Sequence, residues 1–191
     1  MNRVCVFAGS SPGARPAYAA AARALGTELV RRRLGVVYGG GSVGLMGVLA
    51  DTVLGEGGEV VGVIPRGLAG RELAHPSLTE LRIVASMHER KALMASLVDG
   101  FIALPGGLGT FEETLEVLTW SQLGIHRKPV GVLNVAGYFD GLRGMLGHAV
   151  VEGFVRREYL ALLLFAEQPP SLLDALAAWQ PPAIIRAWVD I

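Results

Sequence analysis

Short apolar runs of strand length alternate with longer helical stretches along most of this chain. We expect strands at Val4–Ala8, Val36–Tyr38, Val60–Ile64, Leu81–Ala85, Phe101–Leu104 and Val130–Val135. We expect helices at Pro16–Arg33, Gly44–Gly55, Met87–Val98, Thr110–Leu123 and Phe139–Glu152. This alternation is typical of βαβ units, whose right-handed crossovers place helices on both faces of a parallel sheet. The predicted fold is therefore an α/β, doubly wound, Rossmann-like sheet.

The chain is predicted to form a single domain over residues 1–191. Its length is close to that of one ordinary domain, and no Ser/Pro-rich or charged linker divides it. The tail after Tyr159 holds a further apolar run, Leu160–Phe165, and then a short helix from Ser171. We expect this tail to wrap the edge of the domain.

The composition indicates a buried sheet rather than a membrane protein. Half of the residues (51%) are apolar and the mean hydropathy is +0.44, yet no apolar run approaches the roughly 18 residues of a spanning helix. Met1–Gly9 lacks the features of a secretory signal, so the expected location is the cytoplasm. Cys5 is the only cysteine and lies within a predicted strand, where a buried core role is favoured over nucleophilic chemistry.

The charges predict a small ligand and no metal. Seventeen basic residues balance seventeen acidic ones, so no overall positive field favours binding to nucleic acid or to an anionic membrane. Arg31, Arg32 and Arg33 form one basic cluster, but they end a predicted helix, where cations face the negative end of the helix dipole. The four histidines are scattered without metal-ligand spacing.

Three glycine-rich loops directly follow predicted strands. They read Gly9-Ser10-Ser11, Gly39-Gly40-Gly41-Ser42 and Pro105-Gly106-Gly107-Leu108-Gly109-Thr110. The carboxyl ends of parallel strands meet at one edge of a sheet, where ligands bind. Glycine lets backbone N–H groups approach an anion, and a helix N-terminus favours phosphate. Any one of these loops could be a tight turn, but together they predict phosphate binding, with Ser10, Gly41 and residues Gly106 to Thr110 as candidate contacts.

The third loop belongs to neither common phosphate-binding type. Gly-x-x-x-x-Gly-Lys-Ser/Thr is absent, and Gly-x-Gly-x-x-Gly does not follow the first strand, which disfavours NTP hydrolysis and dinucleotide redox chemistry. Thr110 either caps the following helix or donates to a phosphate oxygen. Glu113 either faces the cleft or completes a capping box with Thr110. Because Glu113 would lie near a helix N-terminus, we expect its carboxylate to stay ionised.

The segment Ser86-Met87-His88-Glu89-Arg90-Lys91 reaches the same edge. Arg90 and Lys91 fall at the start of a predicted helix, where cations oppose the helix dipole unless an anion compensates. Such a local conflict indicates a functional position.

These motifs resemble the Lonely Guy family of cytokinin-activating phosphoribohydrolases. The likeness rests on residues 86–91 and on Pro105-Gly106-Gly107-Leu108-Gly109-Thr110-Phe111-Glu112-Glu113, and it extends over about residues 4 to 155. It implies hydrolysis of an adenosine-type nucleoside 5′-monophosphate, often N6-prenylated, to the free base and ribose 5-phosphate. It also points to a homodimer, as does the predicted helix ending Thr119-Trp120-Ser121-Gln122-Leu123, which carries bulky residues beyond one core-facing stripe. No cofactor is expected. Leu108 and Ala8 depart from the family, which often has tyrosine and cysteine there.

The resemblance also implies roles for individual residues. Arg90 and Glu113 match the catalytic pair, Gly107 to Thr110 match the phosphate loop, and Lys91 and Glu72 match further substrate contacts. Chemistry supports the pair independently, because cleaving an N-glycosidic bond builds positive charge on the ribose, which a carboxylate stabilises. Arg90 cannot act as a base, so it would clamp oxygens or orient the carboxylate.

Two rival functions stay open at this point. A lysine decarboxylase would bind pyridoxal phosphate as a Schiff base, for which Lys91 is the candidate. A non-catalytic carrier of a nucleotide or of molybdenum cofactor would need the glycine loops but not the pair of Arg90 and Glu113. The sequence does not distinguish adenine from N6-prenyladenine as the base.

Overall fold

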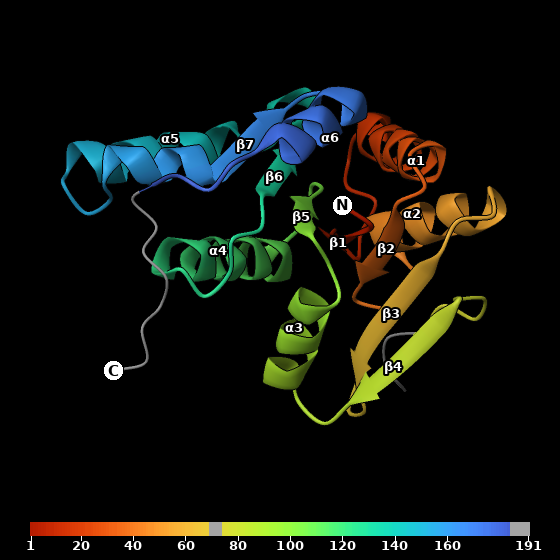
Figure 1. The fold of residues 1–191 in the computed structure, drawn as a ribbon. Coiled ribbons are helices and arrows are strands. Elements are labelled where there is room, and N and C mark those ends of the chain that lie inside the picture. Colours follow the sequence, from red (N-terminus) through yellow and green to blue (C-terminus); the bar gives the residue numbers. More distant parts are fainter. Residues whose placement is uncertain (69–73, 184–191) are drawn as a thin grey trace.

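A computed structural model describes residues 1–68 and 74–183. Its centre is one parallel sheet of seven strands in the order β4-β3-β2-β1-β5-β6-β7, with β4 and β7 at opposite edges (Figure 1). The strands are β1 (Arg3–Phe7), β2 (Gly35–Tyr38), β3 (Val60–Pro65), β4 (Glu80–Val84), β5 (Gly100–Ala103), β6 (Val130–Leu133) and β7 (Leu163–Ala166). The helices are α1 (Pro16–Arg31), α2 (Gly44–Gly55), α3 (Met87–Ser96), α4 (Leu108–Leu123), α5 (Asp140–Val151) and α6 (Pro169–Ala178). Two short 3₁₀ helices cover Val135–Gly137 and Arg157–Leu162.

Helices cover both faces of the sheet, which confirms the predicted doubly wound fold. Successive β1 side chains point to opposite faces, so Val4 and Val6 join one core cluster while Cys5 and Phe7 join the other. Helices α1, α2 and α6 pack on the first face, and α3, α4 and α5 on the second. Because both faces are covered, β1, β2, β3, β5 and β6 read as continuous apolar runs.

The tail completes the sheet instead of wrapping its edge. The residues Leu163–Ala166 pair in parallel with β6 as the seventh strand, and α6 packs against α1, β6 and β7. The apolar run predicted at Leu160–Phe165 is therefore divided between a 3₁₀ helix and a strand. Cys5 is fully buried, as predicted.

The chain reverses its direction of progress across the sheet between β1 and β5. From β1 it runs outward through β2 and β3 to β4, and it then returns through α3 to β5 on the other side of β1. The loops that leave these two strands are joined by a hydrogen bond of 3.1 Å from Gly9 N to Pro105 O. Such a topological switch point opens a crevice at the carboxyl ends of the strands.

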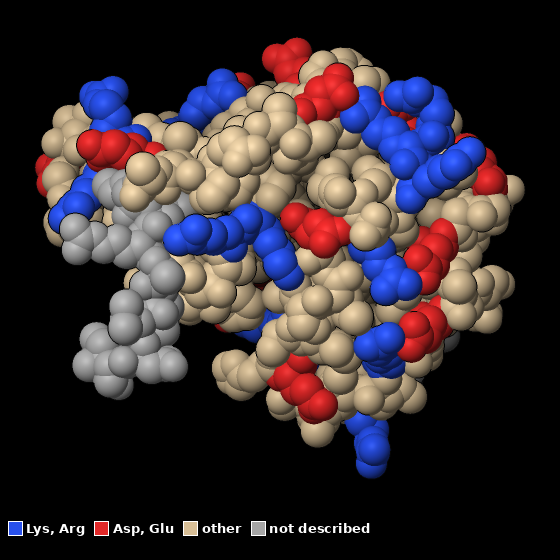
Figure 2. All heavy atoms as spheres, viewed as in Figure 1, with Lys and Arg blue, Asp and Glu red and all other residues tan. Residues whose placement is uncertain are grey.

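The surface agrees with the balanced composition. On the face drawn in Figure 2, basic and acidic side chains are interspersed among uncharged ones. Across residues 1–68 and 74–183, no helix is both long enough and apolar enough to cross a membrane.

Candidate active site

A cavity of about 300 Å³ opens at the switch point. Its wall is made from the loops after β1 and β5 together with two tyrosines, comprising Gly9, Ser10, Ser11, Pro12, Gly13, Tyr18, Leu45, Pro105, Gly106, Gly107 and Tyr138. This volume is at the lower end of the range for small-molecule sites. Two of the three glycine loops thus meet where the fold predicts a ligand, and Ser10 lies in the cavity wall.

The third glycine loop leads into α4, whose first backbone amides have no hydrogen-bond acceptor within the helix. Helix α4 begins at Leu108, with Gly107 as its N-cap, and the Phe111 amide is the first to donate back to Gly107 O, at 3.1 Å. The amides of Leu108, Gly109 and Thr110 therefore have no acceptor within the helix. Since residues 107–109 are exposed, this terminus is available to an anion.

The start of α4 corrects two alternatives from the sequence. The helix begins two residues earlier than predicted, so Thr110 is its third residue and not its cap. The spacing from Thr110 to Glu113 is consequently not a capping box, because that motif starts at the N-cap. Thr110 is instead buried, and its Oγ1 would lie 2.1 Å from a Cβ placed on Gly106. Gly106 must lack a side chain for the loop to close over Thr110.

Tyr138 supports the same loop from the other side. Its hydroxyl donates to the Gly106 carbonyl, and its ring stacks on Phe111 of α4 at a centroid distance of 6.2 Å. The Tyr18 ring meets Tyr138 edge-on at 5.6 Å. Aromatic contacts therefore fix one side of the cavity, and no sequence pattern signals this contribution.

Arg90 is held beneath the second glycine loop. Its side chain is buried, and it donates from Nε to Val63 O at 3.0 Å and from Nη2 to Gly39 O at 3.2 Å. Its Nη1 also lies 3.7 Å from the Met87 sulfur. Carbonyls at the carboxyl ends of β2 and β3 thus stabilise the positive charge of Arg90, which the dipole of α3 disfavours.

The side chains of Ser86 and Glu89 cap the first turn of α3, which carries Arg90. The Ser86 Oγ accepts from the Glu89 amide at 3.1 Å, and Glu89 Oε2 accepts from the Ala85 amide at 2.7 Å. The Ser-x-x-Glu spacing is the sequence signal for such a cap, although Glu89 accepts here from the residue before the N-cap and not from the N-cap itself.

Lys91 is paired with two carboxylates of α4. Its Nζ lies 2.6 Å from Glu112 Oε1 and 2.9 Å from Glu116 Oε1. Burial works to lower the pKa of Lys91, but the hydrogen bonds to Glu112 and Glu116 outweigh it and raise that pKa. An ammonium held in this way disfavours Schiff-base chemistry, which requires a neutral amine.

Glu113 is half-buried on α4, in a recess shared with Phe7, Phe101, Met94 and Lys91. Burial raises the pKa of Glu113 to about 7. Arg90 and Lys91 oppose this rise, while Glu112 and Glu116 add to it. This shift runs against the expectation that the helix N-terminus keeps the carboxylate ionised, because desolvation outweighs the dipole.

The remaining candidates lie in different places. Gly41 is buried in the second glycine loop, where its carbonyl accepts from the Tyr38 hydroxyl at 3.1 Å and its backbone bridges to Ala74. It is not part of the cavity wall at the switch point. Glu72 lies outside the described residues.

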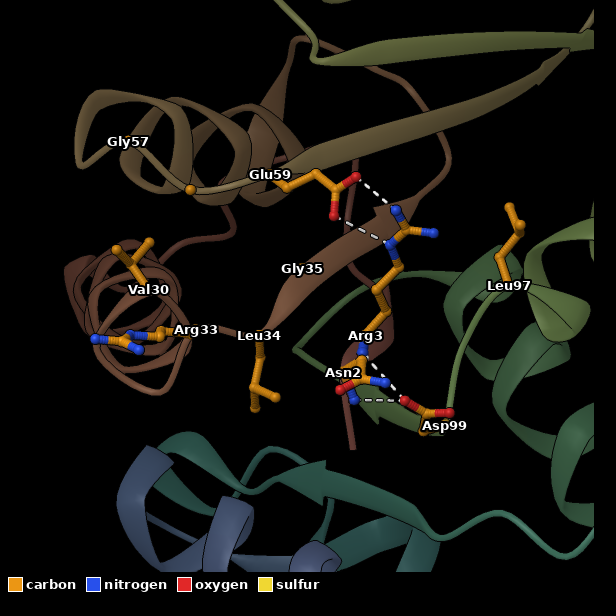
Figure 3. A pocket seen from close by; sticks show the side chains of 11 residues that line it. Asn2, Arg3, Val30, Arg33, Leu34, Gly35, Gly57, Glu59, Leu97 and Asp99 are labelled. Carbon is orange, nitrogen blue, oxygen red and sulfur yellow. Dashed lines mark hydrogen bonds and ion pairs between the residues drawn. The ribbon is translucent and has the colours of Figure 1, made fainter.

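A larger cavity, of about 740 Å³, lies at the other end of the strands, by the amino ends of β1, β2 and β3. Figure 3 shows that Arg3 and Glu59 in its wall pair with each other and that Asp99 contacts Asn2 and Arg3. Arg3 binds Glu59 through Nε at 3.0 Å and Nη2 at 2.6 Å, and Asp99 accepts from the Asn2 and Arg3 amides. The open N-terminus of α4, by contrast, directly follows Gly106 and Gly107 in the wall of the switch-point cavity.

Metal ligation has no support from the side chains whose positions are known. Within the described ranges, no three His, Cys, Asp or Glu side chains are grouped to hold a metal ion. Metal independence stays a prediction.

Comparison with known proteins gives a family. Residues 46–176 match the family model described as "Possible lysine decarboxylase". The chain is 54% identical over 181 residues to the protein of Oryza sativa subsp. japonica named "Probable cytokinin riboside 5'-monophosphate phosphoribohydrolase LOGL5", covering 95% of this chain and 74% of that one. It is 51% identical over 180 residues to "Cytokinin riboside 5'-monophosphate phosphoribohydrolase LOG7" of Arabidopsis thaliana, covering 94% and 83%.

Solved structures add support for the fold. The structure of TM1055 superposes with a TM-score of 0.70 at 21% identity, covering 94% of this chain and all of that one. The molybdenum cofactor carrier protein of Chlamydomonas reinhardtii superposes with a TM-score of 0.69 at 16% identity, covering 93% and 99%. At such identities the likeness concerns the fold alone. The sequence relatives and the two matching motifs decide the family: this chain belongs to the Lonely Guy family of cytokinin riboside 5′-monophosphate phosphoribohydrolases.

Proposed function

We propose that this enzyme hydrolyses the N-glycosidic bond of an adenosine-type nucleoside 5′-monophosphate, releasing the free base and ribose 5-phosphate. The observation that carries the proposal is the placement of Glu113 and Arg90. The carboxylate follows the open N-terminus of α4 by one helical turn, and Arg90 is close enough to affect its ionisation. An anion site and a catalytic carboxylate on one helix suit a substrate that carries a phosphate and a reacting sugar.

The phosphate would bind at the start of α4. The amides of Leu108, Gly109 and Thr110 offer donors, and the helix dipole favours a dianion at this end. We propose that the Thr110 hydroxyl and the loops carrying Ser10 and Gly41 complete the surroundings of the substrate. The apolar wall of Tyr18, Leu45 and Tyr138 suits a flat base or its substituent.

The reaction would then use Glu113 in its ionised form. As the bond between the ribose C1′ and the base nitrogen breaks, its electron pair leaves with the base and positive charge develops on the sugar. A carboxylate beside C1′ stabilises that charge or removes a proton from the attacking water, whose oxygen forms the new bond to C1′. The leaving base takes up a proton, so the products are the neutral base and ribose 5-phosphate.

Arg90 serves in this scheme as a fixed cation. Its contacts with Val63, Gly39 and Met87 use three N–H directions of a group that has five. The others can reach a substrate oxygen or the Glu113 carboxylate. Because a guanidinium keeps its proton, Arg90 orients and balances charge and does not transfer protons.

The finer features of the protein are part of the same proposal. The base is adenine or an N6-prenyladenine, the protein is a cytoplasmic homodimer that does not bind nucleic acid, and no cofactor or metal is required. Lys91 and Glu72 are proposed substrate contacts by family resemblance, although in this structure the Lys91 ammonium is bonded to α4.

One assay tests the proposal against its alternative. The protein is incubated with AMP and with isopentenyladenosine monophosphate, with and without EDTA, and the free base is measured by chromatography. Release of base with equimolar ribose 5-phosphate, unaffected by the chelator, is expected. Tight binding of the nucleotides without release of base would instead indicate a carrier.

A further inference from the structure

Two neighbours of the proposed catalytic pair bind each other across the gap between α3 and α4. Lys91 directly follows Arg90, and Glu112 directly precedes Glu113. The Lys91 Nζ contacts Glu112 Oε1 at 2.6 Å and Glu116 Oε1 at 2.9 Å. Only 11% of the Lys91 side chain is exposed, so these ion pairs are less screened than ordinary surface pairs.

Glu116 is the less expected member of this cluster. One carboxylate oxygen binds Lys91, but the other, Oε2, is buried without a hydrogen-bond partner among the described residues. It lines the recess that also holds Glu113, against the apolar side chains of Phe7, Phe101 and Val117. A buried carboxylate oxygen without a partner is costly, so simple packing does not account for Glu116.

Glu116 and Glu113 are also neighbours on α4. They are three residues apart and therefore lie on the same side of the helix, one turn from each other. Glu116 thus faces Lys91 on one side and the proposed catalytic carboxylate on the other.

We propose that Glu116 is a positioning residue, which together with Glu112 holds the Lys91 ammonium beside Glu113 and so fixes the charge around the carboxylate that Arg90 also faces. The inference rests on the proposed function, in which Glu113 acts on the ribose. It gives Lys91 a role through the carboxylates of α4 in addition to, or in place of, direct contact with the substrate.

The electrostatics of Glu113 agree with this geometry. The charged or titratable groups facing it come from three elements and are Arg90 and Lys91 of α3, Glu112 and Glu116 of α4 and Cys5 of β1. Among these, the two cations lower the pKa of Glu113 and the two glutamates raise it. Removing one member of the cluster should therefore move the ionisation of Glu113 in a direction set by that member's charge.

The first test does not depend on turnover. Protein labelled with ¹³C at the glutamate carboxyl carbons is titrated by NMR, with the Glu113 signal assigned from its loss in Glu113→Gln. Glu116→Gln removes a negative charge while keeping the side-chain shape, so the Glu113 titration should move to lower pH by about 0.5 to 1 unit. Lys91→Met should move it to higher pH by a similar amount.

A matched comparison comes from the other glutamate. Glu112→Gln should shift the titration in the same direction as Glu116→Gln, because each substitution removes a negative charge that raises the pKa of Glu113. Circular dichroism and a thermal melt establish that each variant is folded.

The second test uses the pH profile of kcat/KM for nucleoside 5′-monophosphate hydrolysis. The acid limb of the profile should follow the NMR titrations, moving to lower pH in Glu116→Gln and to higher pH in Lys91→Met.

If both folded variants keep the Glu113 titration of the unsubstituted protein, the inference is wrong. If Lys91→Met raises only KM, Lys91 is a substrate contact and the positioning role is likewise refuted. NMR shifts as expected in a protein that releases no base would refute the proposed function and leave the charge cluster established.

Discussion

The guanidinium of Arg90 occupies the space in which a side chain on Gly39 would stand. A Cβ on Gly39 would lie 2.0 Å from Arg90 Nη2, and the Gly39 carbonyl accepts from the same nitrogen at 3.2 Å. The first glycine of the second loop therefore makes room for a cation, whereas the sequence suggested that this loop approaches an anion. The same contact explains how a buried arginine is tolerated at the start of α3.

Gly39→Ala should displace Arg90 and lower kcat by roughly 10²-fold, since a misplacement of about 1 Å in an active site can cost that much. Overpacking should also destabilise the fold by about 1–3 kcal/mol. Steady-state kinetics and thermal melts measure the two effects. Gly55→Ala, at the end of α2, is the control, because a Cβ there meets nothing within 4 Å. Unchanged turnover in Gly39→Ala would show that catalysis does not depend on this position of Arg90.

Glu113→Gln should lower kcat by roughly two to four orders of magnitude while changing substrate affinity little. The amide keeps the shape of the side chain but removes the charge needed as the ribose becomes cationic. Single-turnover kinetics and equilibrium binding of the nucleotide separate these effects. Glu56→Gln, in the exposed turn after α2, should retain full activity, and equal loss of binding and turnover in Glu113→Gln would contradict the assigned role.

The raised pKa of Glu113 predicts a specific pH dependence of activity. Because the ionised form is the active one in our scheme, kcat/KM should rise with pH through about 7. A general acid at this position would give the opposite trend, with activity falling above the same pH. The profile of kcat/KM from pH 5 to pH 9 decides between them.

The same shift predicts a cost in stability. The folded protein holds the Glu113 proton more tightly than the unfolded chain, in which the pKa of this group is near 4.5. Stability is therefore lost as pH rises from about 4.5 to 7. Glu113→Gln removes that titration. Compared with the unsubstituted protein, it should be more stable at pH 8 by on the order of 3 kcal/mol and nearly equal at pH 4.5. Urea unfolding at both pH values measures the difference, and an equal difference at both would rule out this cause.

Gly109→Ala should weaken substrate binding without harming the fold. A Cβ on Gly109 meets nothing within 4 Å, so the substitution fits the described structure and should stabilise α4 by up to about 1 kcal/mol. The added methyl group would project where we place the phosphate, and KM should rise. Gly141→Ala is a matched control, since Gly141 is likewise the second residue of its helix and a Cβ there also meets nothing within 4 Å. This substitution should raise stability and leave KM unchanged. A normal KM in Gly109→Ala would move the phosphate away from this terminus.

We expect a homodimer at micromolar concentration. Helix α5 has no buried residue, and near its end Val151 and Phe154 are 77% and 88% exposed, as is 52% of Ile125 after α4. Apolar side chains exposed in this way indicate an interface. Light scattering should give twice the mass of one chain, and Phe154→Glu should shift the protein towards monomer. A monomeric unsubstituted protein would contradict the prediction.

The sequence by itself determined the elements and the family of this protein. Six strands, the parallel order of βαβ units and the three glycine loops follow from local patterns, because apolar periodicity and glycine act within a few residues of the chain. The relatives confirm the family that the motifs around Arg90 and Glu113 indicate. Two features had no local signal. Helix α4 begins after its N-cap Gly107, which has no side chain to act as a capping signal, and β7 depends on its pairing with β6.

Only the tertiary structure decided the state of the charged residues. Glu113 has its pKa raised because Phe7 and Phe101, which are distant in sequence, help to exclude water from its recess. The positive charge of Lys91 is balanced by Glu112 and Glu116 on another helix, and the guanidinium of Arg90 donates hydrogen bonds to the carbonyls of Val63 and Gly39. Desolvation and Coulomb interactions depend on distance in space and not on separation along the chain, so the sequence could name these residues but could not show what surrounds them.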